Sequence, residues 1–308
     1  MSLVNLAVYT TIHPGTRPFL KEWFRSVRSQ TDTDVSLWVG IDEVAEEEAC
    51  SIMGGCPDVV HWVQAEEGDT YAQVRERAWR ALIPHADAVV LTDADDVLLP
   101  GRVAHARRHL AGHDGVGCGL RLVGPEGSNL GATMPPDQYA HPAKALPEHN
   151  IFGLSNAAYR TDLLAACLPL PEDVVLIDWF LATQAWLRGA SLSFDPTVQM
   201  KYRRHDENML PLLPPFSAEE IRRTTVVVRK HFQVVEEHVP AGAPEERLSM
   251  LKQAARRAER FAERALGDPE WLEHYTAQLN RLDPEPLWWS CVAHPTLQSL
   301  WSQFSSPQ

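Results

Sequence analysis

The sequence predicts an α/β protein with a mainly parallel central sheet, followed by a helical extension. Short apolar, β-rich runs alternate with amphipathic helical patterns over about the first 110 residues, which is typical of strands joined by right-handed helical crossovers. The composition changes after a proline-rich stretch at 211–215, and helical patterns fill most of the remaining chain. We therefore predict a main domain at 1–213 and a helical extension at 214–308.

Strands are expected where short runs are rich in apolar and β-branched residues, and helices where apolar residues recur every three or four positions. The expected strands are Leu3 to Tyr9, Val35 to Ile41, Val59 to Val63, Ala88 to Leu91, Val116 to Val123, Ile151 to Arg160, Ser191 to Phe194 and Val198 to Tyr202. The expected helices are Arg17 to Ser29, Glu46 to Met53, Thr70 to Leu82, Val103 to Leu110 and Val174 to Arg188, with Ser217 capping the first C-terminal helix. A long loop is expected at 124–150.

The acidic composition argues against a general nucleic-acid binder. The 308 residues carry a formal net charge of -13, whereas such a protein needs a basic face. No stretch approaches about 18 uninterrupted apolar residues, so no transmembrane segment is expected, and the N-terminus lacks the pattern of a signal peptide. The five cysteines show no zinc-site spacing, and a disulfide framework is not expected in a chain of this size, so we expect reduced, mostly buried thiols in a cytoplasmic protein.

Three carboxylates, Asp93, Asp95 and Asp96, follow the apolar strand at Ala88 to Leu91. In open α/β sheets, ligands bind beyond the carboxyl ends of the strands. Clustered carboxylates repel one another and are costly to desolvate, so this position favours a bound cation. Oxygen ligands suit Mg²⁺ or Mn²⁺. The alternative for so short a motif is an acidic turn that caps the next helix.

Three motifs follow one another along the chain: Leu91 to Pro100, Ile177-Asp178-Trp179, and Tyr202 to Asn208. In this order and spacing they resemble the GT-A fold glycosyltransferases of family 2, the inverting nucleotide-sugar transferases. The resemblance implies a Rossmann-like GT-A nucleotide-diphospho-sugar transferase fold. It also implies a hexosyltransferase-type activity, with the nucleotide sugar bound by about 1–100 and the acceptor by about 101–213.

The resemblance covers about Leu3 to Met209 and departs from the family pattern in three elements that hold the base and ribose. This chain has Thr11-Ile12-His13-Pro14 where the family has Pro-Thr-Tyr-Asn, and Asp42-Glu43-Val44-Ala45 where the family has Asp-Asp-Gly-Ser. It has Gln73-Val74-Arg75-Glu76 where the family has Ala-Arg-Asn. The donor nucleotide, of the UDP, GDP or dTDP type, is therefore open. The metal and catalytic motifs match the family.

The resemblance implies that Asp95 binds a Mn²⁺ or Mg²⁺ ion at the diphosphate and that His205 completes the coordination. Asp93 is expected to contact the ribose or a metal-bound water. Asp96 is expected either to assist the metal site or only to cap the next helix.

Arg203 and Arg204 lie beside this histidine, and one of them is expected to contact the diphosphate, where a guanidinium fork fits. The other would be a solvated charge. Further donor contacts are expected from Thr10, Thr11, Asp42 and Arg75. For Arg75, a solvent-facing position on its helix is the equal alternative.

Asp178 is the expected general base, and a base that activates the acceptor hydroxyl implies inversion at the anomeric carbon. The alternative is an early-turn carboxylate that only favours the helix dipole. Glu172 and Asp173 are the nearest rivals for the role.

The acceptor, a glycan or another hydroxyl compound of surface-polysaccharide synthesis, is expected over the 124–150 loop and Ile151 to Asn156. Asn156 and Tyr159 are expected to line its site, and the loop to order over the bound donor.

The apolar C-terminal residues need a covering surface, which is the main domain, a second copy in a homodimer, or the inner membrane face in a peripheral contact. They are Leu287, Trp288, Trp289, Leu297, Leu300, Trp301 and Phe304.

Two competing functions are weighed against sugar transfer. A sugar-1-phosphate nucleotidylyltransferase should carry a glycine-rich, basic signature near the N-terminus, which Thr10 to Phe19 lacks. A catalytically degenerate module that binds nucleotide or glycan agrees with the altered nucleotide elements, but not with the retained Asp95, Asp178 and His205.

Overall fold

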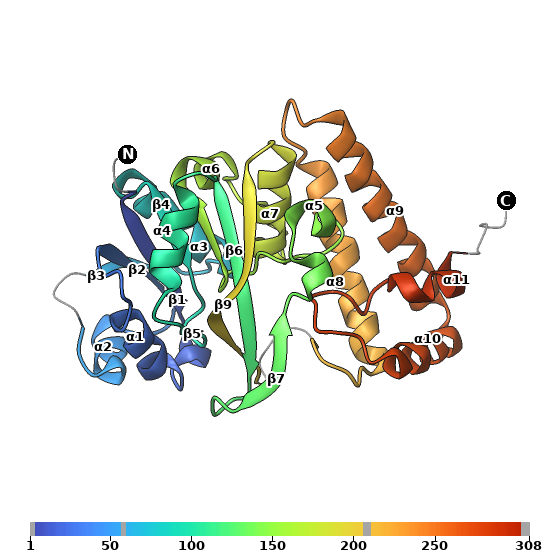
Figure 1. Ribbon diagram of the computed structural model, residues 1–308, viewed down its shortest axis with the longest axis horizontal. Helices are drawn as coiled ribbons and strands as arrows, with labels where there is room; N and C mark the ends of the chain where they lie inside the picture. Colours follow the sequence, from blue (N-terminus) through green and yellow to red (C-terminus); the bar gives the residue numbers. More distant parts are fainter. Residues whose placement is uncertain (1–3, 57–59, 206–210, 303–308) are drawn as a thin grey trace.

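In the residues that the computed structural model describes, 4–56, 60–205 and 211–302, nine strands form one mixed sheet (Figure 1). The strands are β1 (Leu6–Ile12), β2 (Val35–Ile41), β3 (Val60–Gln64), β4 (Ala88–Leu91), β5 (Val97–Leu98), β6 (Gly115–Val123), β7 (Asn129–Met134), β8 (Ala157–Arg160) and β9 (Leu192–Arg203). The α-helices are α1 (Leu20–Arg28), α2 (Glu46–Met53), α3 (Tyr71–Leu82), α4 (Arg102–Leu110), α5 (Pro142–Ala145), α6 (Thr161–Ala166), α7 (Ile177–Leu187), α8 (Ala218–Glu237), α9 (Glu245–Gly267), α10 (Pro269–Leu282) and α11 (Gln298–Trp301).

The spatial order of the strands is β3-β2-β1-β4-β8-β6-β9-β5, with β7 paired to β6. The first four strands are parallel, and Leu6 of β1 pairs with both Val35 and Ala88. β8 runs antiparallel to both β4 and β6, whereas β6 and β9 are parallel to each other. The predicted α/β class is confirmed, and the carboxyl ends of β1, β2 and β4 meet at one edge of the sheet.

Two hydrophobic cores lie on opposite faces of the sheet, because side chains alternate along each strand. Leu6 of β1 belongs to the core that contains Trp23 of α1, whereas Tyr9 belongs to the core that contains Trp79 of α3. All seven residues of β1 are buried, so this strand is covered on both faces and forms the rigid centre from which the site is built.

The segment 124–150 is more regular than the predicted loop. β7 pairs antiparallel with β6, and a 3-10 turn and the short α5 follow it. Asn129 and Gly131 are turn formers with low strand propensity, so pairing with β6 rather than local preference makes this strand. The two short strands expected at 191–202 are likewise one strand, β9, whose register with β6 shifts midway.

The cysteine prediction is wrong for one pair, because Cys50 and Cys56 form a disulfide. α2 ends at Met53 and the chain turns through Gly54 and Gly55, both with positive φ, which brings the two cysteine Cα atoms to 5.0 Å. Cys118, Cys167 and Cys291 are free and buried. The cytoplasmic assignment, which depended on reduced thiols throughout, loses that support.

The C-terminal helices share a hydrophobic core with α7. Trp179 of α7 stacks on His231 of α8, with ring centroids 4.0 Å apart, and on Trp289 at 5.8 Å. Of the covering surfaces considered for the apolar C-terminal residues, the structure therefore provides the main domain. Phe304 lies outside the described residues, and the domain boundary near residue 213 stays a prediction.

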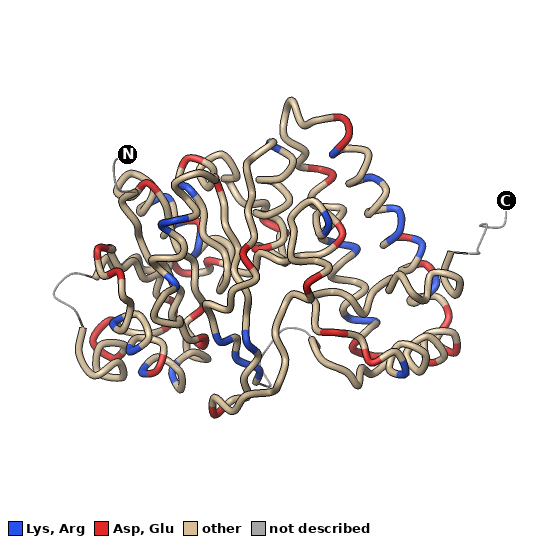
Figure 2. Tube along the Cα trace, viewed as in Figure 1, with Lys and Arg blue, Asp and Glu red and all other residues tan. Residues whose placement is uncertain are grey.

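The exposed side of the C-terminal region has mixed charge. Ser217 caps α8 as predicted, since its Oγ accepts the Glu220 N–H. Along α9, Lys and Arg are interspersed with Glu (Figure 2), while the other side of the helix buries Leu251, Ala258 and Phe261. No described helix is both long and apolar enough to cross a membrane.

Replacing Gly119 by alanine should destabilise the sheet. A Cβ on Gly119 of β6 would lie 2.2 Å from the backbone carbonyl oxygen of Pro196 in β9. The backbone oxygen cannot move aside without disturbing the β6–β9 pairing, so we expect Gly119→Ala to lower the free energy of unfolding by about 1–3 kcal/mol. Denaturant unfolding of both proteins measures the difference.

Gly112→Ala is the matched control, because a Cβ there would meet no atom within 4 Å. Its stability should stay within about 0.5 kcal/mol of the parent. Equal losses in the two variants would show that close packing at Gly119 is not the cause.

Candidate active site

The carboxyl end of β4 delivers three carboxylates to the edge of the sheet, beginning with Asp93. The Asp93 N–H donates to Ser155 Oγ at 3.1 Å, and this hydroxyl donates back to Asp93 Oδ2 at 3.2 Å. Arg75 of α3 places Nη2 3.6 Å from Asp93 Oδ1. Burial raises the pKa of Asp93, the nearby Arg75 opposes this rise, and the charge of Asp95 adds to it. Asp93 is thus a positioned but electrostatically strained carboxylate.

The two predicted metal ligands lie in contact. His205 follows β9 and places its Nε2 2.9 Å from Asp95 Oδ2. The side chains of His205 and Asp95 are 13% and 21% exposed, so solvent or a ligand can reach this pair. The ring of Phe19 lies 5.0 Å from the His205 ring and covers one side of it.

Asp96 is the buried member of the cluster. Its Oδ1 accepts the backbone N–H of Arg203 at 2.6 Å, while its Oδ2 is buried without a hydrogen-bond partner among the described residues. Burial raises the pKa of Asp96 well above its usual value, and the charges of Asp95 and Asp93 raise it further. A bound cation would relieve this repulsion, and Asp95 and His205 are the two of these groups whose potential ligand atoms lie in contact.

The structure separates the roles of the two adjacent arginines and corrects the expectation for Arg203. Its side chain is 1% exposed, and it donates to the backbone oxygens of Asp95 and Pro125 and to Glu22 Oε2, at 2.6–2.8 Å. These contacts occupy the guanidinium, so Arg203 ties the Asp loop to the segment after β6 instead of reaching a ligand. Arg204, by contrast, lines a cavity.

A cavity of about 610 Å³ lies next to the Asp cluster. It brings together four of the predicted site residues, Arg75, Asp93, Asp178 and Arg204, from α3, the β4 loop, α7 and the end of β9. The two rivals for the base role, Glu172 and Asp173, also line it. Asp173 is paired with Lys230 of α8, which holds the pKa of this carboxyl below its usual value and makes it a weak base.

Asp178 lies in the first turn of α7 and is held by two hydrogen bonds. Its Oδ1 accepts the Trp179 N–H at 2.8 Å, and its Oδ2 accepts Nδ2 of Asn150 at 2.8 Å. Asn150 is fully buried and its own Oδ1 accepts the Phe152 N–H at 2.9 Å, so its orientation is fixed. Burial raises the pKa of Asp178 to about 6, with a further contribution from the charge of Asp93, while these hydrogen bonds oppose the rise.

A carboxylate with this pKa is ionised near neutral pH and basic enough to take a proton from a hydroxyl that is being made nucleophilic. Sequence reasoning missed Asn150, because nothing in its local sequence distinguishes it from other loop asparagines. Only its contact with Asp178, 28 positions later, reveals its role.

Several predicted ligand contacts are buried and do not line the cavity. Thr10 and Thr11 are 0% and 5% exposed, and Thr11 Oγ1 bonds the Tyr9 hydroxyl at 2.8 Å. Asn156, predicted on the acceptor side, is fully buried and donates to the carbonyls of Cys118 and Ile151, so its role is structural.

Tyr159, also predicted on the acceptor side, is 3% exposed and packs in the core beneath the sheet edge. This burial corrects the acceptor-side expectation for both residues, because Tyr159 belongs to β8, which lies inside the sheet between β4 and β6, and Asn156 directly precedes that strand. Asp42 is half-buried beyond β2 and does not line the cavity either.

Other cavity residues escaped the sequence reasoning. Tyr71 at the start of α3 is 63% exposed, and its ring lies edge-on to His13, 6.0 Å away. Trp288 and Trp289 reach the cavity from the C-terminal region. The adjacent tryptophans are a visible signal in the sequence, but their place beside the Asp cluster depends on how the C-terminal helices pack.

Structures of nucleotide-sugar enzymes share this fold. The mannosyltransferase PcManGT from Pyrobaculum calidifontis, in complex with GDP-Man and Mn²⁺, matches with a TM-score of 0.61 and 18% identity over 99% of this chain and 82% of its own. S. aureus TarS 1–349, in complex with UDP-GlcNAc, matches with a TM-score of 0.53 and 14% identity over 90% of this chain and 92% of its own. No protein-family model and no curated protein sequence matches the chain. At these identities the likeness establishes the fold.

Proposed function

We propose that this protein is a metal-dependent, inverting glycosyltransferase that moves a sugar from a nucleoside-diphosphate sugar to a hydroxyl acceptor. The observation that carries the proposal is the cavity in which the Asp178 carboxylate, the Asp93 carboxylate and two arginines converge beside the Asp95–His205 pair. The shared fold of two transferases bound to GDP-Man and UDP-GlcNAc supports it.

The donor occupies the side of the cavity near Arg75 and Arg204. Guanidinium groups suit the oxygens of a diphosphate, because they present several N–H donors in one plane. Tyr71, with its exposed ring at the start of α3, offers a surface on which a nucleobase can stack. Because the two neighbours hold guanosine and uridine nucleotides, GDP and UDP are the first donor types to test, followed by dTDP.

Asp95 and His205, whose Oδ2 and Nε2 lie in contact, would hold a Mn²⁺ or Mg²⁺ ion; beside them lie the mutually repelling carboxylates of Asp93 and Asp96, and the buried Oδ2 of Asp96 has no partner among the described residues. When bound, such an ion supplies Lewis-acid stabilisation of the leaving diphosphate. Ser155 and the backbone N–H of Arg203 hold Asp93 and Asp96 in place for this role.

In the reaction, the acceptor oxygen forms a bond to the anomeric carbon while the bond from that carbon to the diphosphate oxygen breaks. Asp178 takes the acceptor proton, and the electron pair of the broken bond stays on the diphosphate. Asn150 keeps the Asp178 carboxylate pointing to the cavity. A single displacement with the base and the leaving group on opposite sides of the sugar inverts the anomeric configuration.

Asp178→Asn should lower the rate constant of transfer by about 10²- to 10⁴-fold, because the amide cannot accept the proton. Nucleotide affinity should change little. In the parent enzyme, activity should rise with pH as Asp178 ionises around its pKa of about 6 and then level off. Product formation from the nucleotide sugar that binds, measured across pH, tests both statements.

The same variant should stabilise the fold. Because burial raises the pKa of Asp178 from 3.8 to about 6, the ionised carboxylate costs the folded state free energy. This cost develops as pH rises from about 4 to 6 and is complete above that range, where removing it should contribute about 1–3 kcal/mol. A gain in melting temperature that is equal at pH 4 and pH 8 would contradict a strained carboxylate.

Arg204→Ala should weaken nucleotide binding by about 10- to 100-fold, the loss expected for hydrogen bonds to a charged group. Arg203→Ala is the contrast, since it leaves the carbonyls of Asp95 and Pro125 unpaired and should lower the free energy of unfolding by about 2 kcal/mol or more. Calorimetric titration and denaturant unfolding of both variants separate the two roles. Nucleotide binding that survives unchanged in Arg204→Ala would remove this residue from the donor site.

Thermal-shift measurements with UDP, GDP, dTDP and CDP, each with Mn²⁺, Mg²⁺ or EDTA, test the proposal as a whole. A ligand that binds only the native state raises the melting temperature by mass action. We expect a metal-dependent rise for one nucleotide that is lost in Asp95→Ala. If the nucleotide raises the melting temperature equally with EDTA and in Asp95→Ala, the proposed metal dependence of nucleotide binding is excluded. A nucleotide that binds without any turnover of its sugar, even to water, would instead favour the degenerate binding module.

A further inference from the structure

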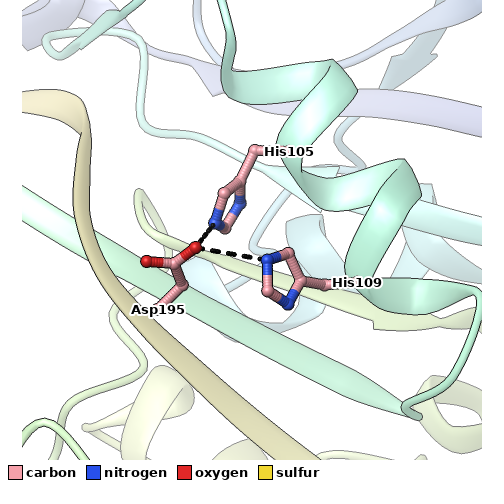
Figure 3. Close-up of side chains that lie close together, drawn as sticks. All are labelled: His105, His109 and Asp195. Carbon is pink, nitrogen blue, oxygen red and sulfur yellow. Dashed lines mark hydrogen bonds and ion pairs between the residues drawn. The ribbon is translucent and has the colours of Figure 1, made fainter.

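A second cluster of metal-ligating side chains lies on another part of the sheet. His105 and His109 occupy successive turns of α4 and face Asp195 near the start of β9 (Figure 3). Asp195 pairs with Cys118 of β6, whereas Arg203, beside the Asp loop, pairs with Val123. Cys118 and Val123 are five residues apart on β6, so roughly 16 Å of strand separates the two sites.

The geometry of the cluster converges on one carboxylate oxygen. Nε2 of His105 lies 3.1 Å and Nε2 of His109 lies 3.2 Å from Asp195 Oδ2. The backbone N–H of Thr197 donates to Asp195 Oδ1 at 2.9 Å, which turns Oδ2 toward the two rings. Helical spacing of four residues places both imidazoles on the same side of α4, with centroids 4.5 Å apart.

The cluster lies at the border between the core and the surface. His105 is 2% exposed, so its ring is held by the surrounding core, whereas the other two members can be reached from solvent. The ring faces the cluster through Nε2, and Nδ1 of His105 has no hydrogen-bond partner among the described residues.

The spacing and chemistry of these ligands distinguish the cluster from the Asp loop. In a tetrahedral zinc site with Zn–N distances of about 2.0–2.1 Å, neighbouring ligand atoms lie about 3.3 Å apart, close to the separations observed here. Two imidazoles and one carboxylate suit Zn²⁺ and related transition ions, whereas Mg²⁺ prefers oxygen ligands. His109 and Asp195 are each 22% exposed, which leaves an open side where water can complete the coordination.

The guanidinium of Arg108 lies where it would compete with a metal ion for Asp195 and His109. Nη2 of Arg108 lies 4.0 Å from Asp195 Oδ2 and 3.5 Å from His109 Nε2. The Arg108 side chain is 70% exposed, so it can swing into solvent without disturbing the core.

We propose that His105, His109 and Asp195 form a second metal site, which takes a transition ion of the Zn²⁺ class and ties α4 to β9. α4 follows the Asp loop in the chain, and β9 leads directly to Arg203, Arg204 and His205. The ion thus fastens together the two elements that flank the proposed active site, and its role is structural. The site does not depend on the proposed transferase activity.

The experiment is a Zn²⁺ titration of the metal-stripped protein against a chromophoric chelator, in an excess of Mg²⁺ to fill oxygen-rich sites. We expect one tightly held ion per chain and a rise in melting temperature on its addition. His109→Ala and Asp195→Asn should each lower the affinity by at least about tenfold. The control His274→Ala, which removes an exposed histidine of α10, and Asp95→Asn should both retain it.

Arg108→Ala provides an independent reading, because removing the competing guanidinium should leave the ion bound as tightly or more tightly. It also keeps the test decisive if a ligand variant folds poorly. The proposal fails if the parent protein binds no Zn²⁺ under these conditions. It fails equally if His109→Ala binds Zn²⁺ as tightly as the parent, or if the ion is lost in Asp95→Asn, which would place it in the other cluster.

Discussion

The structure around the site depends on holding three carboxylates together at the end of β4. Asp93, Asp95 and Asp96 lie within four positions of one another, and burial together with mutual repulsion raises the pKa of both Asp93 and Asp96. The protein offsets this repulsion with groups brought from distant parts of the chain. Arg75 comes from α3, Ser155 precedes β8, and the backbone N–H of Arg203 comes from the end of β9.

Arg203 is the residue that connects this cluster to its surroundings. Its backbone binds Asp96, and its guanidinium binds the carbonyl of Asp95, the carbonyl of Pro125 and Glu22 of α1. The Asp loop is therefore fixed at both its main chain and its side chains before any ligand binds. This preorganisation suits a site that has to stabilise the charge of a departing diphosphate, because little reorganisation remains for the reaction itself.

The proposed base is prepared by a different physical device. Burial raises the pKa of Asp178, and the hydrogen bonds from the Trp179 N–H and the Asn150 amide oppose this rise without cancelling it. Asp195 in the second cluster shows the opposite balance, because its hydrogen bonds outweigh burial and keep it ionised. One fold thus gives three classes of carboxylate: a crowded group at the end of β4, a buried carboxylate with a raised pKa, and a carboxylate between two histidines with a lowered pKa.

The C-terminal helices take part in this arrangement through α7. Trp179, directly after Asp178, is stacked between His231 of α8 and Trp289, so the packing of the C-terminal region fixes the start of α7. Trp288 and Trp289 also line the cavity. The C-terminal region, whose sequence indicates only that its apolar residues must be buried, therefore helps to shape the site.

The sequence by itself determined the alternating elements of the first 110 or so residues, the parallel order of the first strands and the acidic end of β4. These features are local, since they depend on the periodicity of apolar residues and on where a strand ends. It also identified Asp93, Asp178 and Arg204, which the structure brings to one cavity, and Asp95 and His205, which it brings into contact. Only the tertiary structure decided that Arg203 is buried while Arg204 faces the cavity, and that Asn156 and Tyr159 belong to the interior. Strand pairing and contacts between residues far apart in the chain set which side chain is covered, and for the same reason Asn150, the β7 strand and the His105–His109–Asp195 cluster became visible only in the fold.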